Sequence, residues 1–199
     1  MIPEVDVYLP GYLSNDTHDQ TLRELAQHPK TERFYSRLSE YGSKILQGDG
    51  IPNLPVINLP DTKVGSAKVL ILSNTCDIDL DNDRKRFGAM VLYAPIMKLS
   101  AYIGALERSG DTGISEHVQH IKGQRITQIL YLPEIGDLEE CIVFLDRINH
   151  CKNADVSRER LEERKLFSLN QYGHYLLLFK LSMHFTRIHE GVDREFEDA

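Results

Sequence analysis

Apolar residues recur along the chain with two different periods. Between residues 31 and 46 they return every three or four positions, which is the spacing of one helical face. They are Phe34, Leu38, Tyr41 and Ile45. Thr31 stands at the N-cap position of this pattern. The sequence therefore predicts an amphipathic helix over residues 31–46, with a shorter helix over residues 20–27 before it.

After residue 48 the pattern changes to short apolar runs between turn residues. The runs at 68–73, 87–94 and 141–146 are continuously apolar, which predicts strands covered on both faces. Pro95 is expected to end the second of them. Residues 124–132 alternate between polar and apolar, as a half-buried strand does. Within these runs, the expected core strands are Val69–Leu72, Val91–Tyr93 and Ile142–Leu145.

Helical patterns return in the later part of the chain. Residues 99–107 fit a short helix, and Ser157 is expected to cap a helix in the charged segment 157–165. A longer helix is predicted over residues 169–188. Its apolar stripe consists of Tyr172, Leu176, Phe179 and Met183. We expect Phe34, Leu38, Leu176 and Phe179 to be buried.

Helices and strands are segregated along the chain, without a repeated β-α-β order. This order predicts an α+β fold built around a small barrel. We expect an N-terminal helical extension over residues 1–46, a barrel over residues 47–151 that is strongly bent and antiparallel, and C-terminal helices over residues 152–199.

Composition and charge narrow the classes of partner. Of the 199 residues, 41% are apolar and 27% are charged, as in ordinary globular proteins. The net charge of -7 disfavours RNA as the main partner, because nucleic-acid binders usually carry a basic excess. No apolar run approaches the roughly 18 residues of a membrane span, and no secretion signal is recognisable at the N-terminus. We therefore expect a cytoplasmic protein that does not bind a membrane.

The residues that commonly bind metals are not arranged as a site. Three cysteines at irregular spacing fit no zinc pattern, and we expect their thiols to lie in or near the core. The aspartates between residues 77 and 83 alternate, but a calcium loop also needs a Gly and a Glu at positions held here by Asn82 and Gly88. His117 and His120 share a helical spacing without further ligands. We expect no metal and no cofactor.

The segment Asn74-Thr-Cys-Asp77 follows a predicted buried strand and allows two interpretations. In the first, it is a strand-ending turn with an Asx-type cap and a buried thiol. In the second, Cys76 is a nucleophile, or the segment contacts a partner. The aspartates that follow would raise the thiol pKa, which favours the first interpretation.

Four features in the strand region resemble the MazF/PemK toxin family. Gly48-Asp49 stands 24 residues before Leu72-Ser-Asn74, as the barrel-opening Gly-Asp pair of the family precedes its Leu-Ser strand end. Residues 91–96, Val-Leu-Tyr-Ala-Pro-Ile, take the place of the strand ending in Pro-Ile-Thr. Residues 143–147 take the place of the strand ending in Asp-Gln. The resemblance covers residues 47–151 and implies a small SH3-like antiparallel β-barrel.

Two departures from this family bear on catalysis. The arginine that supplies positive charge at the scissile phosphate corresponds to Ala67, and the hydroxyl of Pro-Ile-Thr corresponds to Met97. Lys63 or Lys68 could replace the lost charge, although a lysine lacks the bidentate geometry of arginine. The resemblance therefore implies a barrel without its usual nuclease groups.

The main functional expectation is a catalytically inactive MazF-like binding or regulatory protein, with a homodimer as a further option. Related proteins beside the proteases of type III CRISPR systems, which serve antiviral defence, hold a sigma factor inactive until proteolysis. The partner would then be a sigma factor, an antitoxin-like protein or a protease. The expected contact residues are Asn74, Cys76, Asp77, Lys63, Lys68 and Lys98. The alternatives are an mRNA-interferase-type endoribonuclease of a toxin–antitoxin system and an unrelated α+β domain.

Overall fold

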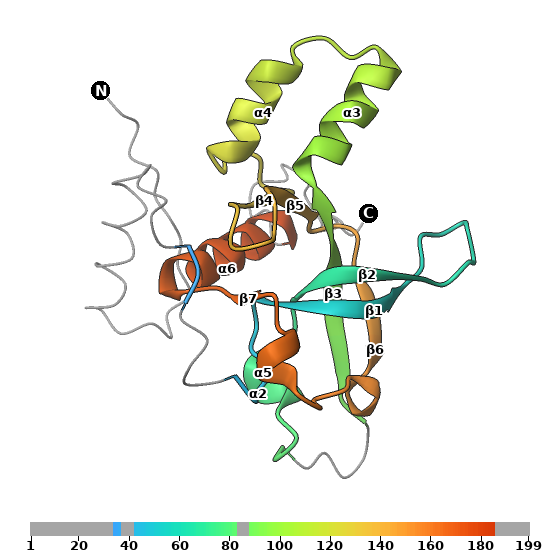
Figure 1. Cartoon of the computed structure of the whole chain (residues 1–199), viewed down its shortest axis with the longest axis vertical. Coiled ribbons are helices and arrows are strands. Elements are labelled where there is room, and N and C mark those ends of the chain that lie inside the picture. Colours follow the sequence, from blue (N-terminus) through green and yellow to red (C-terminus); the bar gives the residue numbers. More distant parts are fainter. Residues whose placement is uncertain (1–33, 37–41, 83–87, 186–199) are drawn as a thin grey trace, which may run out of the picture.

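The computed structural model describes residues 34–36, 42–82 and 88–185 and has an α+β fold (Figure 1). The strands are β1 (Asp49–Val56), β2 (Gly65–Ile71), β3 (Met90–Lys98), β4 (Ile129–Leu132), β5 (Cys141–Phe144), β6 (Asn149–Lys152) and β7 (Phe167–Ser168). The helices are α2 (Thr75–Ile78), α3 (Leu99–Ser109), α4 (Ile114–Lys122), α5 (Leu161–Arg164) and α6 (Gln171–Phe185), with a 3-10 turn at Asn153–Asp155. The α+β prediction is confirmed.

The strands form one antiparallel sheet in the order β4-β5-β3-β2-β1-β7, and β6 also pairs with β3. One edge of β3 pairs with β2, while the other pairs first with β6 and then with β5. The sheet curls into a half-barrel, which brings β1 close to β6. The Ile57 N–H donates to Asn149 Oδ1 at 2.8 Å, and the Tyr93 hydroxyl donates to the Pro55 carbonyl at 2.6 Å. These two bonds join the end of β1 to β6 and to β3 and so maintain the curl.

Apolar side chains cover both faces of this sheet. The odd-numbered residues of β2 and β3, such as Val69, Ile71 and Tyr93, belong to the core cluster inside the curl. Their even-numbered neighbours, such as Leu70, belong to a second cluster that includes Leu176 and Leu177 of α6. A third cluster fills the base of the α3–α4 hairpin, which stands out from the sheet (Figure 1). Burial on both faces explains why these strands are continuously apolar.

The three expected core strands are confirmed as β2, β3 and β5, although Leu72 and Leu145 lie one residue beyond β2 and β5. The strand β3 does not stop at Pro95. It continues to Lys98. Pro95 lies between the ladder that pairs β3 with β6, which ends at Tyr93, and the ladder with β5, which begins at Ile96. The missing N–H of Pro95 therefore interrupts neither ladder, and proline is tolerated at such a position.

The predicted helix over residues 31–46 is wrong wherever the structure describes it. Tyr35 forms a β-bridge with Leu169, and the Ser36 N–H donates to the Ser168 carbonyl at 2.9 Å. Residues 42–44 form a turn rather than a helix. Pairing with a distant segment therefore overrides the local helical pattern. Phe34 is buried as expected, whereas Leu38 and the predicted helix over residues 20–27 lie outside the described residues.

Two other predicted boundaries are wrong. Residues 124–128 are not a strand, because Gln124 adopts a positive φ of 56° and its side chain folds back onto Tyr131. Ser157 does not cap a helix. The helix α5 has only four residues and begins after Arg160, which has a φ of 48°.

The helix α3 is confirmed, and so is α6, except that α6 begins at Gln171 because Leu169 pairs with Tyr35. The buried face of α6 differs from the predicted stripe. Leu176 is buried, Phe179 is only half-buried, and Met183 is 41% exposed. The helix instead buries Gly173 and Lys180. A Cβ atom at Gly173 would lie 2.8 Å from the Phe34 carbonyl oxygen, so α6 packs closely against residues 34–36.

Candidate functional site

The two positions that the family resemblance assigns to the nuclease groups carry packed apolar side chains. Ala67 lies opposite Leu54 and packs against the cluster inside the curl. Met97 lies opposite Ile142 and packs against the cluster under α3 and α4. The ladder between β2 and β3 ends at the Val69–Pro95 pair, and the two residues belong to different clusters. Neither side chain can stabilise an anionic phosphate or transfer a proton.

The lysines considered as replacements lie elsewhere. Successive residues of a strand face opposite sides of the sheet, so Lys68 points away from the face that carries Ala67. Lys63 lies in the exposed β1–β2 loop. Lys98 forms an ion pair with Glu139 at 2.6 Å. Burial raises the pKa of the Cys141 thiol, while Lys68 and Lys98 both lower it, which indicates that both lysines lie near this thiol.

The segment Asn74–Asp77 forms the expected local cap. Asn74 Oδ1 accepts a hydrogen bond from the Cys76 N–H at 2.9 Å and begins the short helix α2. The expectation of a buried thiol is wrong for Cys76, which is exposed, since Ile78 is the residue that α2 buries. Cys141 is buried and Cys151 half-buried.

The six expected contact residues therefore do not converge on one site. Asn74, Cys76 and Asp77 belong to α2 and its cap. Lys68 and Lys98 lie near Cys141, and Lys63 lies in the β1–β2 loop.

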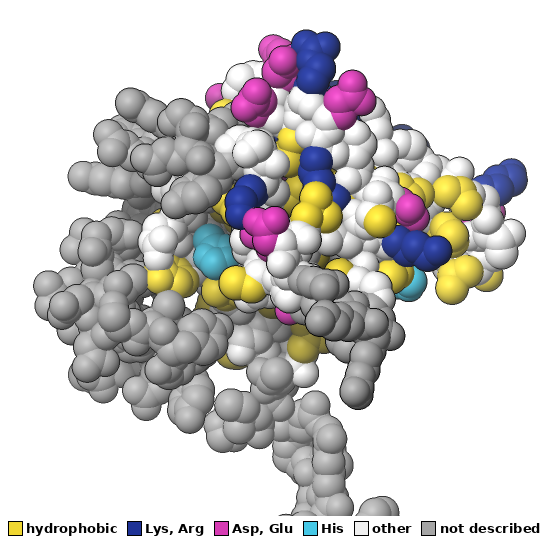
Figure 2. Space-filling view, turned by 90° about the horizontal axis from the view of Figure 1, so that it is seen from below, with side chains coloured by type: hydrophobic (Ala, Val, Ile, Leu, Met, Phe, Trp, Pro, Cys, Tyr) yellow, Lys and Arg dark blue, Asp and Glu magenta, His cyan; other side chains and the backbone are white. Residues whose placement is uncertain are grey.

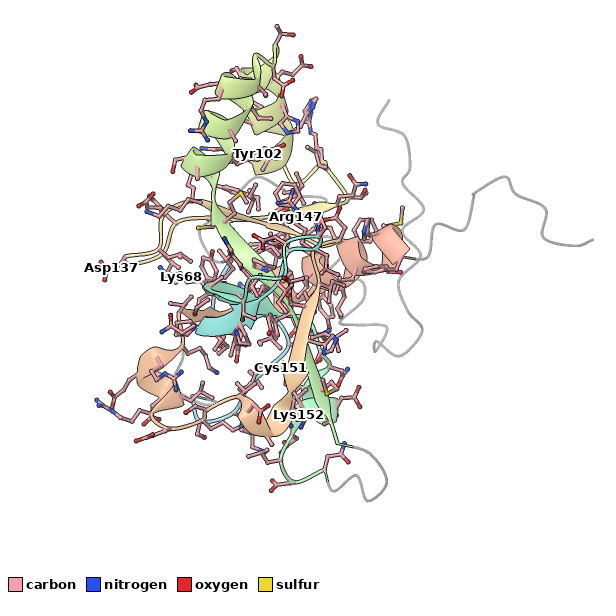
Figure 3. The ribbon with its side chains drawn as sticks, turned by 90° about the vertical axis from the view of Figure 1, so that its right-hand side faces the viewer. Lys68, Tyr102, Asp137, Arg147, Cys151 and Lys152 are labelled. Atoms are coloured by element: carbon pink, nitrogen blue, oxygen red, sulfur yellow. The ribbon has the colours of Figure 1, made fainter. Side chains whose placement is uncertain are left out.

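A cluster of polar and aromatic side chains was not recognised in the sequence. The Tyr102 hydroxyl of α3 lies 3.0 Å from His117 Nε2 of α4. Tyr102 also packs edge-on against Phe144 of β5, with 5.5 Å between ring centroids. The Arg147 guanidinium lies 3.9 Å from the centroid of the Phe144 ring. Burial raises the pKa of Tyr102, and the Arg147 charge opposes that shift. Tyr102 and Arg147 lie on one side of the molecule (Figure 3).

Large exposed apolar side chains gather on and beside the β1–β2 hairpin. We call Ile57, Leu59, Val64 and Ile148 the apolar surface. Ile148 lies next to Asn149, whose side chain accepts from the Ile57 N–H. Met90 and Leu92 are also exposed, but they lie on the face of β3 opposite to Tyr93, which contacts the end of β1. Leu59 is 80% exposed and Val64 is 65% exposed. Figure 2 shows apolar side chains at the right, where Figure 1 places the hairpin. A concentration of exposed apolar residues, unlike single scattered ones, is typical of interaction sites.

Cations accompany this surface although the whole chain is acidic. Lys63 belongs to the hairpin loop, Arg147 precedes β6, and Lys152 ends it (Figure 3). None of these three forms an ion pair with another described residue. Two acidic residues, Asp61 and Asp146, lie in the same segments. The carboxylate of Asp61 already accepts a hydrogen bond from the Lys63 N–H.

No protein-family model matches the sequence, and no curated protein matches it significantly. Within the described part of the chain, no helix is both long and apolar enough to cross a lipid bilayer. The same residues contain no group of three or more His, Cys, Asp or Glu side chains placed to hold a metal ion.

Proposed function

We propose that this chain is a binding protein that acts on another protein and does not cleave RNA. The observation that carries the proposal is the apolar packing of Ala67 and Met97, at the positions where MazF/PemK-like nucleases have a cation and a hydroxyl. Loss of one transition-state donor commonly costs about 10²–10³ in rate. Loss of several cooperating groups removes most of the catalytic advantage.

The finer assignment of the fold is part of the same proposal. The curled sheet of β6, β3, β2 and β1 is consistent with a small SH3-like barrel of the MazF/PemK type. The helices α3 and α4 extend this barrel beyond the proposed common part. In the most concrete version of the proposal, the protein sequesters a sigma factor or an antitoxin-like protein and is regulated by a protease.

The contact surface in this proposal is the apolar surface on and beside the β1–β2 hairpin. The exposed apolar side chains and the nearby cations without ion pairs support this choice. The six expected contact residues do not, because they do not converge on one site. Replacing Leu59 and Val64 together with serine should weaken binding of the natural partner strongly, because exposed apolar anchors supply much of the energy of protein interfaces. Both side chains are exposed, so the fold should be retained.

This prediction is tested by cross-linking in the native host, followed by identification of a stoichiometric partner. The matched control is Leu80→Ser, because Leu80 is 64% exposed but lies beyond α2, outside the apolar surface. The partner should be lost from the double variant and kept by the control. Equal capture by all three proteins would contradict the proposed surface.

We also expect the purified protein not to cut single-stranded RNA above background. The net charge of -7 adds to the missing chemistry, since it opposes capture of a polyanion. The measurement is a cleavage assay on a mixed-sequence RNA. Robust sequence-specific cutting would contradict the proposal.

A rearranged endoribonuclease is the second candidate function, and one cluster favours it. Tyr102, His117 and Arg147 bring together a hydroxyl, an imidazole and a cation, the kinds of group that RNA cleavage requires. If this candidate is correct, cutting should be lost on His117→Ala and kept on His120→Ala, which removes a histidine from the same helix. Cutting that both variants retain would exclude this cluster as its source.

A further inference from the structure

The hydrogen-bond pattern of β6 leaves its outer edge unpaired among the described residues. The Asn153 N–H donates to the Ala89 carbonyl at 2.9 Å, just beyond the β3–β6 ladder. Hydrogen-bonded and non-bonded pairs alternate in antiparallel sheets, so Cys151 and Asn149 direct their backbone groups toward β3. His150 and Lys152 then direct theirs outward. Leu92 of β3, which lies opposite His150, shows the same alternation. Its carbonyl points away from β6 and accepts a hydrogen bond from the Leu72 N–H, at the end of β2.

These outward groups have no partner in the described part of the chain. The backbone N–H and C=O of His150 and Lys152 form no hydrogen bond with any residue in that part. A short edge strand with unused donors and acceptors is a template for a further strand. The side chains of both residues are exposed.

The opposite edge of the sheet, at β4, is closed by side chains. Gln124 pairs with both backbone groups of Tyr131, accepting from its N–H at 3.1 Å and donating to its carbonyl at 2.6 Å. Lys180 donates to the Ile129 carbonyl at 2.7 Å, and the Ile129 N–H donates to Ile126. All four outward groups of β4 are therefore satisfied.

The free part of the β1 edge is also unsuited to strand addition. Pro52 and Pro55 have no N–H to donate, and Asn53 has a positive φ of 61° at an irregularity in the register. The edges at β4 and at the free part of β1 are thus blocked, by different means, whereas no described residue blocks the edge of β6.

The surroundings of β6 indicate the chemistry of a strand that would fit there. Leu92 and Met90, which pair with His150 and Lys152, present exposed apolar side chains on the same face of the sheet. Arg147 and Lys152 supply positive charge at the two ends of the strand without ion-pair partners among the described residues (Figure 3). An occupant with alternating apolar and acidic side chains complements both features.

We propose that the outer edge of β6 binds an extended acidic segment of the protein partner, which adds to the sheet as an antiparallel or parallel strand. This mode of recognition uses main-chain hydrogen bonds for affinity and side-chain contacts for specificity. The inference rests on the proposed function, because it specifies how the proposed partner is held.

The test uses the full-length protein and a fluorescently labelled six-residue peptide in which glutamate alternates with valine. Anisotropy should report binding to the wild type. His150→Pro removes an outward N–H without removing a bond to β3, and proline is compatible with an edge strand at such a position. We expect binding about tenfold weaker or more, because one main-chain bond is lost and the proline ring obstructs its neighbour.

The matched control is His150→Ala, which removes the same imidazole but keeps the N–H. It should bind the peptide as the wild type does. A peptide in which lysine replaces glutamate should bind weakly, and salt should weaken the binding of the acidic peptide. Equal binding by the proline variant and the wild type, or no binding by either, would overturn the inference.

Hydrogen exchange supplies a second readout at the residues themselves. The amides of His150 and Lys152 should become protected when the acidic peptide is added. Protection that depends on protein concentration without peptide would assign the edge to a second copy and overturn the inference. Failure of the peptide, with the natural partner still captured through Leu59 and Val64, would leave the proposed function intact. Sequence-specific RNA cutting would overturn the proposed function whatever the peptide does.

Discussion

Replacing Lys180 with methionine should lower the free energy of unfolding by about 3 kcal/mol or more. Lys180 is 1% exposed, and its Nζ donates to the carbonyls of Gln124, Ile126 and Ile129 at 3.0, 2.6 and 2.7 Å. The ammonium form has three donors, which matches the three carbonyls, and the neutral amine still has two. Methionine would fill much of the space but would remove all three of these hydrogen bonds, and only the Ile126 carbonyl would keep another donor, the Ile129 N–H.

The loss should be measured by urea denaturation, with Lys122→Met as the matched control. Lys122→Met is the same substitution at a half-exposed lysine, which forms an ion pair with Glu140. Such pairs contribute about 0–1 kcal/mol, so the control should be much less affected. A similar loss in both variants would contradict a special role for Lys180.

The cost of Lys180→Met should also depend on pH. Burial lowers the pKa of Lys180 from 10.5 to about 7, so the folded protein releases this proton earlier than the unfolded chain as the pH rises. Between these two values the unfolded state binds more protons, and stability from this group increases with pH. The variant lacks this contribution, so its deficit should be larger at pH 9 than at pH 6.5. An equal deficit at both values would contradict the lowered pKa.

Lys165→Met should cost about 3–5 kcal/mol, because it leaves the Asp49 carboxylate buried without its cation. Lys165 Nζ lies 2.8 Å from Asp49 Oδ2 and also donates to the Lys44 carbonyl. Asp49 is completely buried and accepts further bonds from the Ser168 hydroxyl and the Leu46 N–H. The Gly-Asp pair noted in the sequence thus joins the start of β1 to β7.

The double variant Asp49→Asn/Lys165→Met tests this explanation. Asparagine can still accept hydrogen bonds but carries no charge, so the double variant should be more stable than Lys165→Met alone. Thermal or urea unfolding of the four proteins in the cycle provides the measurement. Additive losses from the two substitutions would show that the ion pair is not the cause.

The pH dependence of the Lys165→Met variant should follow from the Asp49 carboxylate, which stays buried. Burial raises the pKa of Asp49, and the Lys165 ammonium opposes this shift in the wild type. Without Lys165 the folded pKa should rise further above the unfolded value. Between the unfolded and the folded pKa of Asp49, the folded variant binds more protons than the unfolded chain. The stability of the variant therefore falls as the pH rises through this range. The cost of Lys165→Met should therefore be smaller at pH 5 than at pH 7.

The sequence by itself determined the elements that depend only on neighbouring residues along the chain. The continuous apolar runs around Val69, Val91 and Ile142 identified buried strands, since a strand covered on both faces has no need of polar alternation. The Asn74 cap was recognisable because its side chain bonds to a backbone group two residues away. The apolar replacements Ala67 and Met97 were also read from the sequence, through a family register that stays a prediction.

The tertiary structure decided what depends on distant partners. Tyr35 lies on a helical pattern but pairs with Leu169, because backbone bonds to that segment outweigh a weak local preference. From the sequence alone, Lys180 resembles a surface residue of an amphipathic helix. In the structure it is buried, and the carbonyls of Gln124, Ile126 and Ile129 accept its hydrogen bonds. Asp49 and Ser168, 119 positions apart, meet only after the sheet has curled. The open edge of β6 likewise depends on hydrogen-bond phase and on which strands lie beside it, neither of which a residue pattern specifies.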